Sequence, residues 1–282
     1  MSKNEIYIQI LKQEENLMEF IIRNISSAFA NTLRRIILSE IPILAIDEVV
    51  FLENTSVMFD EMLAHRLAMI PLKIDLASYE YFYECWLEGK ADNCIVVFKM
   101  EVEASDKPTT VFSGHLELIK PAYEDLLKLP LKIEPVSESI PIVKLAPGQR
   151  VSLEAYAKLG TAKEHAKWQS VATVYYRNLA KIIIKQEKCD KSCEECVKVC
   201  PHNVLEFRNG KIIVINELAC DTCRACMEAC PDIIEVDWDK NSFLFTIEGI
   251  GVLPVSYILN IALNLLERRL IRFKERFNEI KL

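Results

Sequence analysis

Glycine is scarce in this sequence, with 7 residues in a chain of 282. The glycine-rich phosphate loops G-x-G-x-x-G and Walker A are missing, as is the G-x-S-x-G nucleophile elbow. This excludes the common nucleotide-binding and serine-hydrolase sites. No apolar run reaches about 18 residues, the length that a membrane span needs. The N-terminal stretch MSKNEIYIQILKQEENL is too charged for a signal peptide. We therefore expect a cytoplasmic protein with no membrane contact.

The sequence also lacks an excess of basic residues. It has 34 Lys and Arg against 41 Asp and Glu, a formal net charge of −7. Because binding to nucleic acid needs concentrated positive charge, we expect no direct DNA binding. No acidic motif for paired magnesium ions is recognisable either. His65 and Arg66 have no evident nucleophile or carboxylate partner, so we assign no catalytic residue to the chain.

Cysteine is abundant and clustered. The chain has 10 cysteines, and eight of them lie within residues 189–230. In a cytoplasmic protein such clustering indicates metal binding rather than a disulfide framework. Cys85 and Cys94 lie apart, next to apolar residues, and we expect both to be buried free thiols.

The clustered cysteines form an internal repeat. The stretches 193-CEECVKVCPHNVLEF-207 and 223-CRACMEACPDIIEVD-237 share their cysteines and prolines at an offset of 30 residues. Between them, the turn Asn209-Gly210 precedes a predicted strand at 211–216. Three closely spaced cysteines, followed by a fourth before a proline, are typical of bacterial-type ferredoxins, in which the fourth ligates the other cluster. We therefore predict a ferredoxin-like module.

The repeat assigns ligands to one or two 4Fe-4S clusters. The first cluster takes Cys200, Cys220, Cys223 and Cys226, and the second takes Cys193, Cys196, Cys230 and Cys189. Cys189 lies one residue out of register, and Asp190 occupies the register position instead. Asp190 is therefore an alternative ligand, and this cluster could also be a 3Fe-4S form or be absent with its thiols oxidised. Two zinc sites are the alternative to iron, but the prolines and the repeat favour iron–sulfur.

The rest of the chain predicts an α+β fold. Strands are expected at 5–12 and 17–23, followed by a helix at 25–42 that Ser26 or Asn24 caps. A strand at 243–251 would complete a sheet with the first two. A last helix at 253–282 opens with Pro254, and Leu266, Leu270, Phe273 and Phe277 follow one of its sides. We interpret it as a docking helix for a partner subunit, with an intramolecular core helix as the alternative.

Three segments of the sequence carry a specific resemblance. They are 23-RNISSAFANTLRRIILSEIPILAIDEV-49, 59-FDEMLAHRLAMIPL-72 and 164-EHAKWQSVATVYYR-177. Together they resemble the RNA polymerase α-like family, which includes the bacterial α subunit, the third-largest subunit of eukaryotic polymerase II and the D-type subunit of archaeal polymerase. An embedded ferredoxin-like module narrows the resemblance to the archaeal type.

The resemblance implies an architecture and partners. Residues 1–45 and 242–282 would form a dimerisation domain, 46–187 an inserted α/β domain and 188–241 the ferredoxin-like 4Fe-4S domain. Subunit L would bind through the first helix and the last. The small zinc-binding subunits and the large catalytic subunits would then dock on the resulting platform. The implied interface comprises Phe29, Leu33, Arg34, Arg35, Ile36, Leu266, Leu270, Phe273 and Phe277. For Arg34 and Arg35, a solvated helix face is the alternative to contact with the second-largest subunit.

The cysteine module by itself supports a rival function, an electron-transfer subunit of an oxidoreductase complex. Such a subunit needs neither the three segments nor an apolar last helix. We therefore prefer a non-catalytic assembly subunit of archaeal RNA polymerase, in which the cluster is structural or regulatory.

Overall fold

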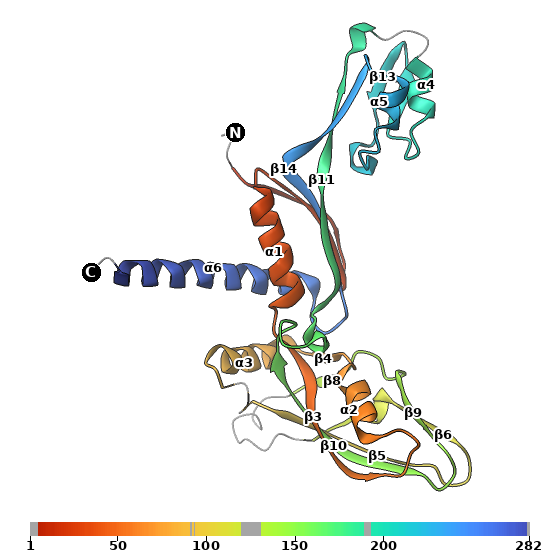
Figure 1. Cartoon of the computed structure of the whole chain (residues 1–282), viewed down its shortest axis with the longest axis vertical. Coiled ribbons are helices and arrows are strands. Elements are labelled where there is room, and N and C mark those ends of the chain that lie inside the picture. The colour runs from red at the N-terminus through yellow and green to blue at the C-terminus, as the bar shows by residue number, and fades with distance from the viewer. Residues whose placement is uncertain (1–4, 91, 93, 120–130, 189–192, 281–282) are drawn as a thin grey trace. The chain divides into compact units, whose positions relative to one another are not determined.

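The computed structural model describes residues 5–90, 92, 94–119, 131–188 and 193–280, which fold into a mixture of helices and strands (Figure 1). The chain forms two units, each discontinuous in sequence. Unit 1 comprises residues 1–12, 19–31 and 175–246, and unit 2 comprises 13–18, 32–174 and 247–282. The predicted mixed fold class is confirmed, whereas the bounds of the three predicted domains stay a prediction.

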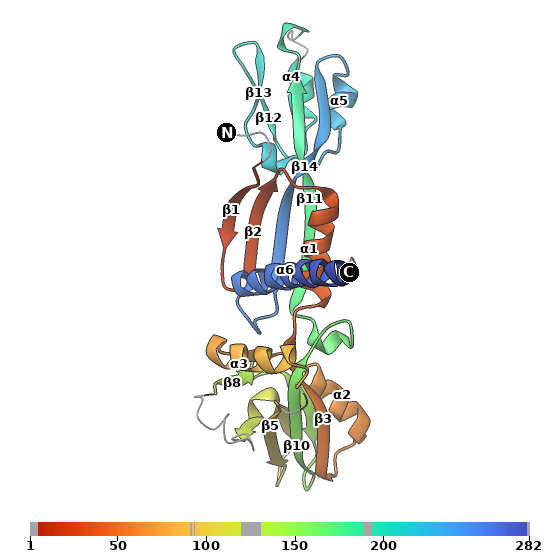
Figure 2. The same ribbon diagram turned by 90° about the vertical axis from the view of Figure 1, so that its left-hand side faces the viewer.

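A four-stranded sheet forms the body of unit 1, and its strands lie side by side in Figure 2. The order is β1 (Tyr7–Gln13), β2 (Leu17–Arg23), β14 (Ile234–Gly249) and β11 (Val171–Ile184). Aromatic rings fill one face: Phe20 stacks on Phe245 at 5.3 Å, and Tyr176 meets the Phe243 ring edge-on at 5.3 Å. The strand predicted at 243–251 does pair with β2, but it begins at Ile234. It is longer because the last apolar run of the cysteine repeat continues into it.

The ferredoxin-like module lies at the far end of β11 and β14, also within unit 1. It contains α4 (Cys193–Lys198), β12 (Leu205–Arg208), β13 (Lys211–Val214), the short helix η6 (Glu217–Ala219) and α5 (Ala225–Ala229). Asn209 and Gly210 turn between β12 and β13 with φ of 52° and 75°, as a tight hairpin requires. Its core is small and includes Val204, Leu205, Ile212, Ile234 and Val236.

Helix α1 (Ser27–Ser39) follows β2. The Ser26 hydroxyl accepts a hydrogen bond from the Phe29 amide at 3.2 Å, so Ser26 is the cap. Asn24 instead has a φ of 64°, and its side chain bonds the Glu5 carbonyl. The helix ends before Pro42, as predicted.

A second sheet, ordered β3–β10–β5–β7, forms the body of unit 2. Alternate residues of β5 are fully buried, including Val96, Phe98 and Met100, because every second side chain points to the same face. The sheet consists of β3 (Ile43–Asn54), β10 (Arg150–Gly160), β5 (Val96–Glu103) and β7 (Glu117–Ile119). Two-stranded sheets pair β4 (Leu72–Ile74) with β8 (Ile133–Pro135) and β6 (Thr109–Phe112) with β9 (Pro141–Leu145). Between α1 and the last helix, unit 2 contains α2 (Asp60–Ala68), α3 (Leu76–Leu87) and the single turns η2 (Ser113–His115) and η4 (Ala166–Trp168). The single turn η5 (Gln186–Lys188) belongs to unit 1.

The last helix, α6 (Val255–Ile280), has two different halves. Its first half belongs to the core of unit 2, where Val255, Ile258, Ile261, Ala262 and Leu265 are buried. Beyond Leu265, no described residue of α6 is buried. The alternative of an intramolecular core helix is therefore correct for the first half, whereas docking of a partner subunit by the second half stays a prediction.

Candidate metal centre and docking surface

Four cysteine side chains line one pocket, here called the cavity, in the ferredoxin-like module. They are Cys200, Cys220, Cys223 and Cys226, and all four are free thiols. Cys200 follows α4, Cys220 and Cys223 belong to the loop that leads into α5, and Cys226 lies in α5 itself. The fold thus brings together the four residues that the spacing predicts for the first cluster.

The donor set of this cavity fits an iron–sulfur cluster. A cubane binds one thiolate at each of its four irons, and four thiols line this one cavity. Val204, Leu205 and Val236 supply apolar surface between them. The Val204 amide donates a hydrogen bond to the sulfur of Cys200 at 3.4 Å, a contact of the type that tunes such clusters.

The electrostatics of the cavity reflect the crowding of its thiols. Burial raises the pKa of both Cys220 and Cys226, and the neighbouring Cys200 raises it further. A protonated thiol cannot ligate, so loading requires that protons leave, and metal coordination supplies the positive charge that removes them. Within the described residues, no three His, Cys, Asp or Glu side chains form a group that could hold a single metal ion.

The loop that leads from Cys220 to α5 has an unusual backbone. Thr222 and Arg224 have φ of 62° and 66°, a conformation that non-glycine residues adopt at a cost of about 1 kcal/mol or more. The Asp221 side chain supports the turn by accepting the Cys223 amide at 3.0 Å. Its other oxygen lies 3.0 Å from Nε2 of His202, and this hydrogen bond lowers the pKa of Asp221. The sequence had not assigned a role to His202, which lines the cavity.

The residues predicted for the second cluster are only partly described. Cys196 and Cys230 are 0% and 7% exposed and form a disulfide with Cα atoms 5.8 Å apart. In this form neither supplies a thiolate, which corresponds to the predicted alternative with oxidised thiols. Cys189 and Asp190 lie outside the described residues, as does the side chain of Cys193. The second cluster and its ligands therefore stay a prediction.

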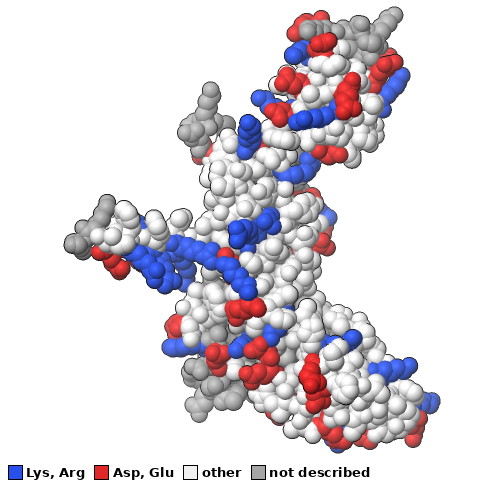
Figure 3. Space-filling model, in the orientation of Figure 1, with Lys and Arg blue, Asp and Glu red and all other residues white. Residues whose placement is uncertain are grey.

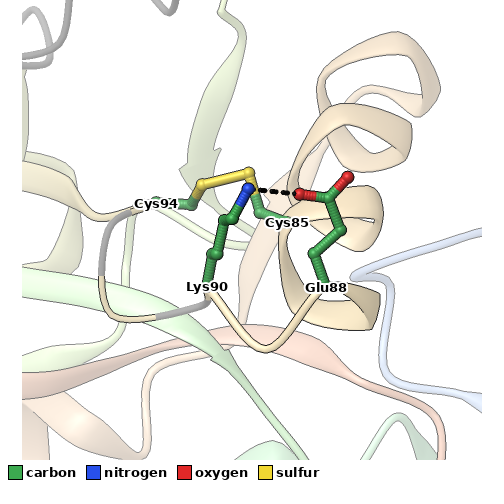
Figure 4. Close-up of a disulfide and its surroundings, with 4 residues drawn as sticks. All are labelled: Cys85, Glu88, Lys90 and Cys94. Atoms are coloured by element: carbon green, nitrogen blue, oxygen red, sulfur yellow. Dashed lines mark hydrogen bonds and ion pairs between the residues drawn. A yellow bond between two sulfur atoms is a disulfide. The ribbon is translucent and has the colours of Figure 1, made fainter.

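The expectation of free thiols at Cys85 and Cys94 is wrong. The two residues form a disulfide between the end of α3 and the segment just before β5. Glu88 and Lys90, whose charged atoms are 2.8 Å apart, form an ion pair beside it (Figure 4). The chain reverses direction between these elements. This reversal brings Cα atoms nine residues apart in sequence to within 6.4 Å, a distance that a disulfide spans.

The three segments that carry the family resemblance meet in unit 2. Asp47, from the first segment, forms an ion pair with Lys167 from the third. The rings of His65 and His165, from the second and third segments, lie edge to face at 6.4 Å. The Ser170 hydroxyl donates to the carbonyl of Ile37 at 3.1 Å. The segments are therefore motifs of one packed region.

Two further contacts involve Trp168 of the third segment and Arg66 of the second. Trp168 is 5% exposed, packs against Gly160 and donates from its indole nitrogen to the Lys158 carbonyl at 3.2 Å. The guanidinium of Arg66 donates to the Pro141 carbonyl at 2.8 Å and so ties α2 to β9. Both side chains therefore contribute to packing and to contacts between elements.

Comparison with known proteins covers almost the whole chain. The RNA polymerase Rpb3/RpoA insert domain matches residues 49–174, and the 4Fe-4S dicluster domain matches residues 176–234. DNA-directed RNA polymerase subunit Rpo3 of Pyrobaculum arsenaticum is 38% identical over 272 residues, 95% of each chain. The subunits Rpo3 of Archaeoglobus fulgidus and Pyrococcus furiosus are each 37% identical, over 97% and 95% of this chain and 98% and 95% of their own.

The chain belongs to the Rpo3 family, the D-type subunits of archaeal RNA polymerase. Its cysteine module is therefore one domain of an Rpo3-type subunit. None of the helices in the described ranges has both the length and the apolarity to cross a membrane.

The predicted interface residues of this Rpo3-type chain fall into two groups. On α1, Leu33 and Ile36 are buried at 1% exposure, Phe29 and Arg34 are half-buried, and Arg35 is exposed. On α6, Leu266 is half-buried, whereas Leu270, Phe273 and Phe277 are 63%, 70% and 48% exposed. Among the predicted interface residues, the exposed apolar side chains are thus on α6, and two of the α1 residues belong to the core.

Proposed function

We propose that this chain is the non-catalytic assembly subunit of an archaeal DNA-directed RNA polymerase, and that it forms a heterodimer with subunit L in the cytoplasm. The observation that carries this proposal is the exposed apolar face of α6. Leu270, Phe273 and Phe277 recur at helical spacing, and the rings of Phe273 and Phe277 stack at 6.3 Å. Large apolar side chains that remain in water favour a partner that covers them.

Charged residues on the other side of α6 support the same proposal. Figure 3 shows Lys and Arg along one side of this helix and uncharged residues along another. The basic residues alternate with Glu267 and Glu275 in the sequence. A helix with one charged and one apolar face docks through the apolar face, so the partner is expected to offer a complementary apolar surface.

The region where the three segments meet would serve the rest of the assembly. We infer that the heterodimer with subunit L is the platform on which the small zinc-binding subunits and the large catalytic subunits dock. Arg35, which is exposed on α1, is available to pair with carboxylates of a large subunit. Catalysis and DNA binding would reside in those large subunits.

The ferredoxin-like module would hold a structural iron–sulfur cluster on Cys200, Cys220, Cys223 and Cys226. When bound, the cluster supplies thiolate bonds that cross-link the end of α4 to α5 and to the loop before it. A module of about 50 residues buries too little apolar surface to be stable alone. A second cluster, as 4Fe-4S or 3Fe-4S, would need Cys196 and Cys230 in the reduced state.

Affinity purification from cell extract tests this function. We expect the tagged chain to return subunit L and the other polymerase subunits in stoichiometric amounts. Recovery of dehydrogenase or hydrogenase subunits instead would favour the alternative, an electron-transfer subunit. A variant with Leu270→Ser, Phe273→Ser and Phe277→Ser is the matched control, because its changes are confined to the exposed half of α6.

A further inference from the structure

Arg177 connects the central sheet of unit 1 to the loop that carries the first cluster ligand. It lies on β11 and is half-buried. Its Nη1 donates to the carbonyl of Cys220 at 2.8 Å, and its Nη2 donates to the carbonyl of Leu218. One guanidinium therefore binds two carbonyls at the point where η6 ends and the cysteine loop begins.

The geometry of these two bonds restricts the loop. A guanidinium is planar and rigid, so two acceptors on one fork have their relative orientation fixed as well as their position. The carbonyls at the end of a helical turn have no partner within the helix and need one from outside. At the other end of η6, the Asn216 side chain accepts the Ala219 amide at 3.3 Å. The segment before Cys220 is thus held at both ends.

The loop after Cys220 is held less firmly. Thr222 and Arg224 are in the left-handed conformation, and an exposed side chain, Asp221, supports the turn between them. A strained loop relaxes unless its surroundings fix it. Arg177, which lies on a strand of the sheet, fixes this loop at the ligand residue Cys220.

We propose that Arg177 is a positioning residue for the iron–sulfur cluster. It holds Cys220 at the cavity wall before the cluster enters, and it places a permanent positive charge beside a centre whose thiolates make it negative. The inference rests on the proposed cluster assignment. It predicts two separable effects, one on how firmly the iron is held and one on the reduction potential, because hydrogen bonds and net charge near a cluster set both.

Three variants separate these effects. Arg177→Met removes the charge and both donors, and second-shell losses of this kind change metal retention by about 10–100-fold. Arg177→Lys keeps the charge but cannot bind two carbonyls with a planar fork. Arg208→Met is the control, because Arg208 lies in the same module but is 63% exposed and pairs with Glu206 on its own strand.

The experiment follows anaerobically reconstituted full-length chains. Iron loss to a chelator is timed from the decay of the visible absorption, and the reduction potential is measured by redox titration. We expect Arg177→Met to lose iron about 10–100-fold faster at a lowered potential. Arg177→Lys should also lose iron faster but keep a potential near that of the wild type, and Arg208→Met should match the wild type in both.

The outcomes distinguish this inference from the cluster assignment. A wild-type chain that binds no iron and sulfide would overturn both. If the wild type binds the cluster and Arg177→Met loses iron at the same rate and has the same reduction potential, the role of Arg177 alone would be overturned. Melting of the iron-free chains checks whether Arg177 has a purely structural role. In that case Arg177→Met and Arg177→Lys would destabilise the iron-free chain equally. The two loaded variants would also have the same reduction potential.

Discussion

Glu40 and Arg269 form an ion pair that ties the end of α1 to α6. The Glu40 side chain is 11% exposed, and its other oxygen accepts Nζ of Lys163 at 2.7 Å. A carboxylate at the C-terminal end of a helix is disfavoured by the helix dipole, so these two cations are needed to hold it there. The exposed apolar face of α6 begins at the next residue, Leu270. The ion pair therefore links α6 to the end of α1 just before the exposed residues that we propose as the docking surface.

Replacing Glu40 by glutamine should lower the free energy of unfolding by about 1–2 kcal/mol. This is less than the loss of a fully buried pair, because the side chains of Lys163 and Arg269 are 57% and 52% exposed. Urea denaturation followed by circular dichroism measures the change. The exposed pair of Glu15 and Lys73 provides the control, and Glu15→Gln should cost no more than about 0.5 kcal/mol. Equal effects of the two variants would contradict a special role for Glu40.

Gly160→Ala should destabilise unit 2 by about 1–3 kcal/mol, because a Cβ at this position would overlap the ring of Trp168. Thermal melting measures the loss. A double-mutant cycle with Trp168→Leu identifies its cause: if the ring is the obstacle, the second substitution relieves part of the penalty. Additive effects of the two changes would show that the crowding lies elsewhere.

Much of this architecture is predictable because it follows from local patterns. The Ser26 cap, the Asn209-Gly210 hairpin and the spacing of Cys220, Cys223 and Cys226 depend on residues a few positions apart, and Cys200 follows from the internal repeat. The contacts of Arg177 depend on how elements distant in sequence pack, and the Cys85–Cys94 disulfide depends on how the chain reverses between α3 and β5. No spacing rule links Arg177 to a carbonyl of Cys220, and no composition rule separates a buried thiol from a bridged one. The burial of Leu33 and Ile36 shows a further limit, because an apolar helix stripe does not reveal whether it faces its own core or a partner.

Asp47 should make the stability of unit 2 sensitive to acid. Burial alone would raise the pKa of Asp47, but hydrogen bonds from Lys167 and Lys158 outweigh it and hold the pKa below the ordinary 3.8. The ionised form is therefore favoured in the folded chain. Its stabilisation is complete above that ordinary value and is lost as the pH falls through the lower folded-state pKa. Wild type should exceed Asp47→Asn in stability at pH 7, and the difference should shrink below about pH 4. A pH-independent difference would contradict this account.

The Cys85–Cys94 disulfide should stabilise the oxidised chain by about 2–3 kcal/mol, the loop-closure entropy expected for cysteines nine residues apart. Melting with and without a phosphine reductant, together with a mass-spectrometric thiol count, measures this contribution. Cys85→Ser should melt like the reduced wild type and be insensitive to the reductant at this site. A wild-type chain with both thiols free under non-reducing conditions would disprove the bridge.

The cluster on Cys200, Cys220, Cys223 and Cys226 should stabilise its module. Replacing Cys220, Cys223 and Cys226 by serine removes three ligands, so the module should become protease-sensitive and assembly with subunit L should fall. Limited proteolysis and co-purification yield are the measurements. Normal assembly by a triple variant that remains folded would rule out the structural role of the cluster.

The central claim is that the open face of α6 binds subunit L. Native mass spectrometry of the co-expressed chains tests it most directly, with the wild type compared with the variant Leu270→Ser, Phe273→Ser, Phe277→Ser. Because these side chains are exposed in the isolated chain, the variant should melt like the wild type. We predict a stable 1:1 complex for the wild type and a folded, unassembled chain for the variant. Failure of the wild type to bind subunit L, or undiminished binding by the variant, would contradict the claim.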